Sequence, residues 1–146
     1  MSRLTQVKLD KEFLSKLNPV WNASSTYAEK YIEKLGEEEA NYYSRAYEFD
    51  GSPVCCWGVY KEWDKVGTIY IVFDKRAHGC LKSIVKQAKK DLDYAFEKDF
   101  RRLSAVFDID APTLPMMKTF GFDYCGVYRN YGIGGHGTFY SFERIR

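Results

Sequence analysis

The residues best suited to chemistry in this sequence lie in a turn between a strand-like and a helix-like segment. The turn covers residues 74–79 and contains Arg76, His78 and Gly79. A strand that enters a helix through a glycine-containing turn directs backbone N–H groups, and the positive end of the helix dipole, toward one point. The sequence therefore predicts an anion site at this turn, with a phosphate group as the typical ligand.

The segments on either side of the turn have clear periodicities. Residues 66–73 are β-branched and aromatic and are bounded by charged residues, which predicts a strand. From Leu81 to Phe96 the apolar residues recur at helical spacing and the opposite face carries lysines, which predicts a long amphipathic helix. Two regular elements thus position the turn.

The turn sequence Arg76-Ala-His-Gly79-Cys-Leu81 resembles the Arg/Gln-x-x-Gly-x-Gly/Ala turn of the GCN5-related N-acetyltransferases (the GNAT family), which holds the pyrophosphate of acetyl-CoA. The family has a small residue at the last position, whereas this sequence has Leu81. One expectation is that the Leu81 side chain points to the core, because it begins the apolar stripe of the helix. The resemblance implies a cofactor site made of Val72, Phe73, Arg76, Ala77, His78, Gly79, Cys80, Leu81 and Lys82.

A second segment, Lys118-Thr-Phe-Gly-Phe122, is similar to the Lys-Leu-Gly-Phe ending that opens the family's sixth strand. Under this resemblance, the position that commonly carries the family's acid tyrosine is Met117, which cannot donate a proton. The common asparagine position is Asp110. The two motifs cover roughly the last half of the chain, and the first half resembles the family in element order alone.

An acetyltransferase needs a base that takes a proton from the incoming ammonium group and profits from an acid that protonates the leaving thiolate. The predicted strand 66–73 contains no Asp or Glu, although the family often has a base there. Tyr124 and Tyr128 are candidate catalytic residues. For these tyrosines, packing is the favoured interpretation. For His78, a spectator or phosphate neighbour is favoured over a catalytic role. Other candidates are Glu62, Asp64, Asp74 and Tyr131, each favoured as a surface charge or a packed ring.

Periodicity predicts the elements in the order β-α-α-β-β-β-α-β-α-β-β. This is the order of the GNAT fold, so we expect a single α/β (α+β) domain over residues 1–146, with a splayed mixed sheet of about six to seven strands and helices on both faces. The predicted strands are 5–9, 41–49, 53–60, 66–73, 102–108, 122–128 and 137–144, and the predicted helices follow Asp10, begin near Ser24, begin at Leu81 and cover 111–120.

Composition narrows the function classes. The 146 residues have 45% hydrophobic and 29% charged residues, as soluble globular proteins do, and the net charge of +2 gives no support for nucleic-acid binding. No apolar run approaches the roughly 20 residues of a membrane span, and no signal peptide is recognised, which predicts a reducing cytoplasm. The four cysteines lack metal-binding spacing, so we expect small buried hydrophobes and no metal.

Two functions remain open. The first is an acetyl-CoA-dependent N-acetyltransferase that transfers directly to an amine of a small molecule or protein, which enters between the first helices and the terminal hairpin. The second is a catalytically silent GNAT-fold protein that binds protein partners or assembles as a homo-oligomer. The chain looks similar to short GNAT-like proteins of tailed bacteriophages, which implies host cytoplasm or virion. An open notch beside Gly79 would favour the enzyme, and an apolar groove on the outer sheet edge would favour assembly.

Overall fold

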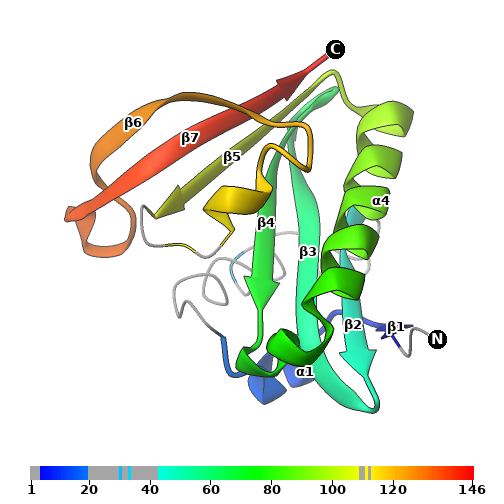
Figure 1. The fold of residues 1–146 in the computed structure, drawn as a ribbon. Coiled ribbons are helices and arrows are strands. Elements are labelled where there is room, and N and C mark those ends of the chain that lie inside the picture. Colours follow the sequence, from blue (N-terminus) through cyan, green and yellow to red (C-terminus); the bar gives the residue numbers. More distant parts are fainter. Residues whose placement is uncertain (1–3, 20–29, 31–32, 34–42, 109–110, 112) are drawn as a thin grey trace.

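The computed structural model describes residues 4–19, 30, 33, 43–108, 111 and 113–146. These residues form one seven-stranded mixed sheet in the order β1-β2-β3-β4-β5-β7-β6 (Figure 1). The predicted helix near Ser24, and Asp110, lie outside the described residues. The strands are β1 (Leu4–Val7), β2 (Arg45–Phe49), β3 (Ser52–Trp63), β4 (Val66–Phe73), β5 (Arg102–Asp108), β6 (Asp123–Tyr131) and β7 (Gly137–Ile145), and the helices are α1 (Lys11–Lys16), α4 (Leu81–Asp99) and the short 3-10 helices η1 (Lys75–Cys80), η2 (Leu114–Met116) and η3 (Ile133–Gly135).

The sheet consists of two antiparallel parts joined by one parallel contact. Strands β1 to β4 pair with their neighbours in antiparallel fashion, as do β5, β7 and β6. Between β4 and β5 the pairing is parallel and covers only Val66 with Arg102, Gly67 with Leu103, and Thr68 with Ser104. Beyond Thr68 the two strands diverge, as Figure 1 shows. The sheet is therefore splayed at this contact, as predicted.

Helices α4 and α1 pack on opposite faces of the sheet, which we call the α4 face and the α1 face. Alternate residues of a strand point to opposite faces. Accordingly Ile69, Ile71 and Phe73 of β4 belong to the core that includes Ile84 and Leu92 of α4. Tyr70 and Val72 belong to a second core that contains Phe13 and Leu14 of α1, and Cys55 and Cys56 divide between the two cores in the same way.

Local sequence explains where several elements begin and turn. The side chain of Asp10 accepts a hydrogen bond of 2.7 Å from the backbone N–H of Phe13, which caps α1 as predicted. Between β2 and β3, Asp50 and Gly51 have φ values of 51° and 84°, the conformation that a tight two-residue hairpin requires. Strands β4 and β5 have the predicted bounds.

Two expectations differ from the structure. The predicted helix over 111–120 contains only the short 3-10 helix η2 within its described residues, because Pro115 cannot donate the hydrogen bond that a continuing helix needs. Cys125 is exposed, whereas Cys55, Cys56 and Cys80 are buried as expected. Trp63 is exposed at the end of β3, while Trp57 lies in the core. Across the described part of the chain, no helix is both long and apolar enough to cross a membrane.

Candidate functional site

The divergence of β4 from β5 leaves residues 69–73 of β4 without a strand partner on that edge among the described residues. No described residue of β5 pairs with β4 beyond Thr68, whereas β3 pairs with β4 as far as Phe73. An extended molecule with amide groups can add to such an edge through backbone hydrogen bonds. The side chains of Val72 and Phe73, which the sequence placed at the site, are buried on opposite faces, so these residues present backbone rather than side chains to the gap.

The predicted phosphate turn follows directly, as η1 and the start of α4. Asp74 caps η1 by accepting a hydrogen bond from the backbone N–H of Arg76. Cys80, the residue before α4, has no side-chain hydrogen bond to the first turn of the helix. The first N–H groups of a helix have no partner within it, and the 19 residues of α4 give it a full helix dipole. The arrangement suits an anion.

Gly79 makes this turn approachable. A Cβ atom added at Gly79 would meet no other atom within 4 Å, so the space beside the backbone is open. Ala77 and Cys80 point into the α4-face core and fix the turn to it. His78 and Lys82 are exposed. The turn thus exposes backbone at Gly79 and one cation at the start of α4.

Arg76 has a different environment from the one that the motif suggested. Its Nε and Nη2 donate to Oδ1 and Oδ2 of Asp74 at 2.8 and 3.0 Å, and Nη2 also donates to the backbone oxygen of Lys16 at 3.0 Å. The backbone N–H of Asn18 donates to the same carboxylate at 2.6 Å. Arg76 therefore ties η1 to the segment that follows α1. Its role toward a phosphate stays a prediction.

The electrostatics of Asp74 follow from these contacts. The carboxylate has no exposed surface, and burial by itself would raise its pKa. The hydrogen bonds from Arg76 and Asn18 and the guanidinium charge outweigh burial and hold the pKa of Asp74 below its usual value. Asp74 is thus a charged structural anchor under the turn.

Leu81 contradicts the expectation that it points to the core. Its side chain is 37% exposed, and the buried stripe of α4 starts one turn later at Ile84. A leucine side chain therefore projects from the first residue of α4, where the family motif has a small residue. Any anion at Gly79 must be accommodated beside it.

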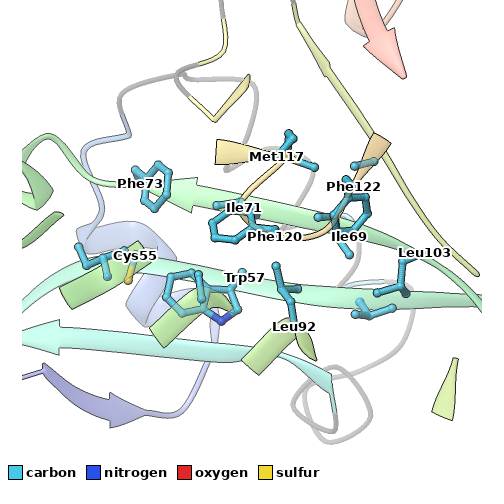
Figure 2. Close-up of a cluster of buried hydrophobic side chains, with 14 of the residues drawn as sticks. Cys55, Trp57, Ile69, Ile71, Phe73, Leu92, Leu103, Met117, Phe120 and Phe122 are labelled. Atoms are coloured by element: carbon cyan, nitrogen blue, oxygen red, sulfur yellow. The ribbon is translucent and has the colours of Figure 1, made fainter. Parts of the chain in front are cut away.

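Met117 is a core residue. It is 1% exposed and packs in the α4-face core, close to Phe120 and Phe122 and opposite the β4 residues Ile71 and Phe73 (Figure 2). Its thioether cannot donate a proton. Among the described residues, Tyr47 is the buried tyrosine of that core and its hydroxyl donates to Asp91, while Tyr43 and Tyr140 pack against the core from partly buried positions. A buried methionine thus occupies the position where, under the family resemblance, an acid tyrosine would be expected.

The two tyrosine candidates lie on β6, but on different faces. Tyr124 pairs with Phe142 of the α4-face core, while Tyr128 pairs with Phe139. Both rings are exposed, at 57% and 43%. A bulge between Tyr124 and Gly126 shifts the alternation and separates them. The structure does not bring these two residues together.

The carboxylates that flank β4 also separate. Glu62 accepts a hydrogen bond from Thr68, and Asp64 forms a 3.7 Å ion pair with Lys61. Both lie at the β3–β4 hairpin, at the opposite end of β4 from the turn. Sequence reasoning missed a better placed carboxylate, Asp108, which ends β5 opposite Phe139. The signal for it was the sheet register, which the sequence does not display.

A pocket of about 290 Å³ lies elsewhere, between the second half of α4 and strands β2 and β3. Its carboxylate Asp91 accepts hydrogen bonds from Trp57 Nε1 at 3.0 Å, from Gln87 at 2.8 Å and from the Tyr47 hydroxyl. Burial, followed by the bond and charge of Asp91, raises the pKa of Tyr47. These groups hold α4 against the sheet. In the described residues, no group of three or more His, Cys, Asp or Glu side chains gathers as a metal site.

Comparison with solved structures shows the fold. An acetyltransferase of the GNAT family from Bacillus anthracis superimposes with a TM-score of 0.66 at 17% identity, covering 99% of this chain and 96% of its own. An N-acetyltransferase from Staphylococcus aureus superimposes with a TM-score of 0.69 at 18% identity, covering 99% of each chain. A Bacillus subtilis acetyltransferase in complex with CoA superimposes with a TM-score of 0.71 at 10% identity, covering 100% of this chain and 99% of its own.

Sequence comparison adds nothing to this. No family model matches the chain, and no curated protein matches it. At identities below a fifth, the structural likeness establishes the architecture alone, since one fold hosts many functions. The chain has the GNAT fold.

Proposed function

We propose that this chain, with its GNAT fold, transfers an acetyl group from acetyl-CoA to an amine of a small molecule or protein. One observation carries the proposal. The pairing of β4 with β5 stops after Thr68, and the remainder of β4 leads into a turn whose backbone is open at Gly79. An acetyltransferase of similar fold has been solved in complex with CoA, which supports CoA as the kind of cofactor.

The residues fit the cofactor in part. The unpaired edge of β4 can receive the amide groups of the pantetheine arm. The backbone at Gly79 and the first turn of α4 can hold the pyrophosphate, with the Lys82 charge close by. Ala77 and Cys80 anchor the turn from below, and His78 is a neighbour of the same anion site. Leu81 takes the place of a small residue and narrows the space through which the pyrophosphate would approach the backbone at Gly79.

Acetyl-CoA supplies a thioester, which is already activated toward an amine. The chain must then place the amine and exclude water, because a direct transfer needs no covalent intermediate on the protein. Thiols are far more acidic than alcohols, with a pKa of about 8.5 for the cysteine side chain, so the thiolate of CoA can depart near neutral pH without an acid. Met117 therefore slows the reaction without forbidding it. We expect a rate below that of an enzyme with an acid tyrosine.

The alternative is a GNAT-fold protein without catalysis. Two observations favour it: Arg76 is engaged by Asp74, and Met117 is buried where the resemblance called for an acid. In that case the partners would be proteins or further copies of the chain. The resemblance to phage-encoded proteins, and with it a virion location, stays a prediction.

The first experiment is calorimetric titration of the purified protein with acetyl-CoA. We expect micromolar binding, and we expect Gly79→Trp to abolish it, because its side chain would occupy the space that is open at the Cβ position. Lys90→Trp is the matched control: it adds the same ring on an exposed face of α4, more than two turns from Gly79, and should bind normally.

Absence of binding at millimolar acetyl-CoA, in a protein whose circular dichroism shows it folded, would reject the acetyltransferase function and favour the alternative. Equal binding by wild type and Gly79→Trp would show that the cofactor does not use this turn. After a positive titration, acetyl transfer to a panel of primary amines is followed by release of free CoA thiol.

A further inference from the structure

Strand β6 carries a large share of the exposed apolar surface. The described part of the chain has eight large hydrophobic side chains that are exposed, and four of them belong to this one strand of 9 residues. These four are Tyr124, Val127, Tyr128 and Tyr131. Single exposed apolar residues are normal on a protein surface, whereas a contiguous group marks an interaction site.

The same strand forms an edge of the sheet. One edge of β6 pairs with β7, and no other strand of the described residues pairs with its outer edge. In Figure 1, β6 (orange) borders the sheet on the side away from β1. The outer edge of such a strand presents backbone N–H and C=O groups that can pair with another strand. Exposed rings and an open edge therefore coincide in one element.

Two bulges define which part of β6 can pair. The register shifts on either side of residues 126–129, which themselves keep a continuous register with residues 138–141 of β7. A Cβ atom added at Gly126 would meet no other atom within 4 Å, so the backbone at the start of this stretch is open to a neighbour. Because bulges protect the ends of an edge strand from pairing, the regular middle stretch is the part that remains available.

The rings on both sides of this edge are already ordered by contacts within the terminal hairpin. The ring centre of Tyr124 lies 5.6 Å from that of Tyr140 and 5.9 Å from that of Phe142, in edge arrangements. The rings of Tyr128 and Tyr131 pack in the same way at 5.0 Å. Ordered rings lose little conformational entropy when they contact a partner. Tyrosine is also enriched in protein interfaces, where its ring is buried.

The two charged residues of β6 lie toward opposite ends of the strand. Asp123 is its first residue, and Arg129 lies near its other end. Both are exposed, and neither has an ion pair or a side-chain hydrogen bond within the part of the chain that the structure describes. When a second copy of β6 lies antiparallel to the first, the Asp123 end of each strand comes near the Arg129 end of the other. A parallel alignment would bring like charges together.

We propose that two copies of this chain associate through β6, antiparallel and around a two-fold axis that passes through residues 126–129. A two-fold axis makes each contact twice, so one surface is its own complement. An acidic or a basic partner would match one of the two charges of β6, whereas a second copy matches both. The two sheets would continue into each other across the axis. This interface does not rest on the proposed acetyl transfer.

Sedimentation velocity over a range of protein concentrations measures the association. We expect a monomer–dimer equilibrium with a micromolar dissociation constant, because one strand edge with its flanking rings buries less area than a standard stable interface. Val127→Lys places a charge in the middle of the contact, as natural edge strands do to prevent pairing, and should raise the dissociation constant about tenfold or more. Trp63→Lys is the matched control, because it adds the same charge at an exposed ring on β3.

Exchange of the two charges tests the antiparallel alignment. Arg129→Asp places two carboxylates at each end of the paired strands, and we expect the dissociation constant to rise about tenfold. Asp123→Arg should weaken the dimer to a similar extent through two guanidinium groups. The double variant restores opposite charges at both ends and should dimerise about as well as wild type. Damage to the fold would instead accumulate in the double variant.

A monomer at all concentrations, in protein that circular dichroism shows to be folded, would overturn this interface. A dimer that Val127→Lys leaves intact would also overturn it, because such a dimer must use another surface. A double variant that dimerises more weakly than either single variant would reject the antiparallel alignment. Acetyl-CoA binding is titrated separately, so the proposed function and this interface can fail independently.

Discussion

At the scale of single residues, Asp74 is the most constrained charge in the described structure. It has no exposed surface, and its carboxylate accepts from Asn18, from the Arg76 backbone and twice from the Arg76 guanidinium. One side chain thereby joins the end of α1, the end of β4 and the turn at Gly79. The shape of the candidate phosphate site depends on it.

We predict that Asp74→Ala lowers the free energy of unfolding by about 2 kcal/mol, because removing the buried carboxylate leaves the backbone N–H groups of Asn18 and Arg76 without their acceptor. Urea denaturation measures this. Asp123→Ala, which removes an exposed carboxylate, should change the midpoint little. A midpoint equal to wild type in Asp74→Ala would show that the ion pair does not hold the turn.

The same residue gives stability a pH dependence. Its pKa is lowered in the folded protein, so the unfolded chain takes up the proton first as the pH falls. The contribution of the Asp74 carboxylate to the free energy of unfolding is complete above about pH 4, the pKa of an unperturbed Asp, and is lost as the pH falls further. Asp74→Asn should remove this part of the acid-dependent loss. Unfolding curves at several pH values between neutral and acid check the sign.

Arg76 shows what residue types reveal and what they leave out. The motif correctly placed the arginine in a turn before a helix. It could not show that Asp74, two residues earlier, would be buried by contact with Asn18, which lies 56 residues away. A long-range contact thus decides the environment of an arginine that the motif alone assigned to phosphate.

At the scale of elements, α4 is held to the sheet by a polar cluster as well as by its apolar stripe. Asp91 accepts from Trp57, Gln87 and Tyr47 in the middle of the helix. We predict that Asp91→Ala costs about 2 kcal/mol, since the indole N–H and the phenol would be buried without an acceptor. Urea denaturation followed by Trp57 fluorescence measures the loss.

Asp91→Asn is the matched variant, because its amide oxygen still accepts a hydrogen bond. It should lose less stability than Asp91→Ala. If both variants unfold at the same urea concentration as wild type, the apolar stripe alone fixes α4.

Element prediction succeeded where local signals agree. The β-branched run of β4 and the helical spacing of α4 are each long and bounded by clear breaks, so β4 was found with both limits and α4 with its first residue, although α4 continues to Asp99. The segment after β5 has short apolar steps interrupted by Pro115, and of its described residues only Leu114–Met116 adopt a 3-10 helix. Short segments depend on packing that the sequence alone does not specify.

At the scale of the whole molecule, the two parts of the sheet meet, within the part of the chain that the structure describes, along three residue pairs of β4 and β5. We predict that acetyl-CoA slows amide hydrogen exchange in residues 69–73, because a bound pantetheine arm would supply partners to the open edge of β4. Exchange measured by mass spectrometry reports this. Peptides from the β3–β4 hairpin serve as the internal control, and no slowing in 69–73 at saturation would place the cofactor elsewhere.

The row of paired residues Asp108, Phe139 and Tyr128 shows, at this scale, what the sequence alone does not predict. Asp108, Tyr128 and Phe139 are separated along the chain, and no motif links them. Their row exists because β7 lies between β5 and β6 and because the bulges of β6 set its register. The element order could be predicted from periodicity, whereas the strand register that brings these three residues side by side could not.

The position of β7 also affects how the protein is made. The ribosome delivers β5 and β6 first, yet in the finished sheet neither strand pairs with the other. Both pair instead with residues 137–145, which are synthesised after them and lie between them in the sheet. Strands β1 to β4 can close in the order of synthesis, but the half that carries Asp108 and Tyr128 can assemble only once β7 has followed both of its neighbours.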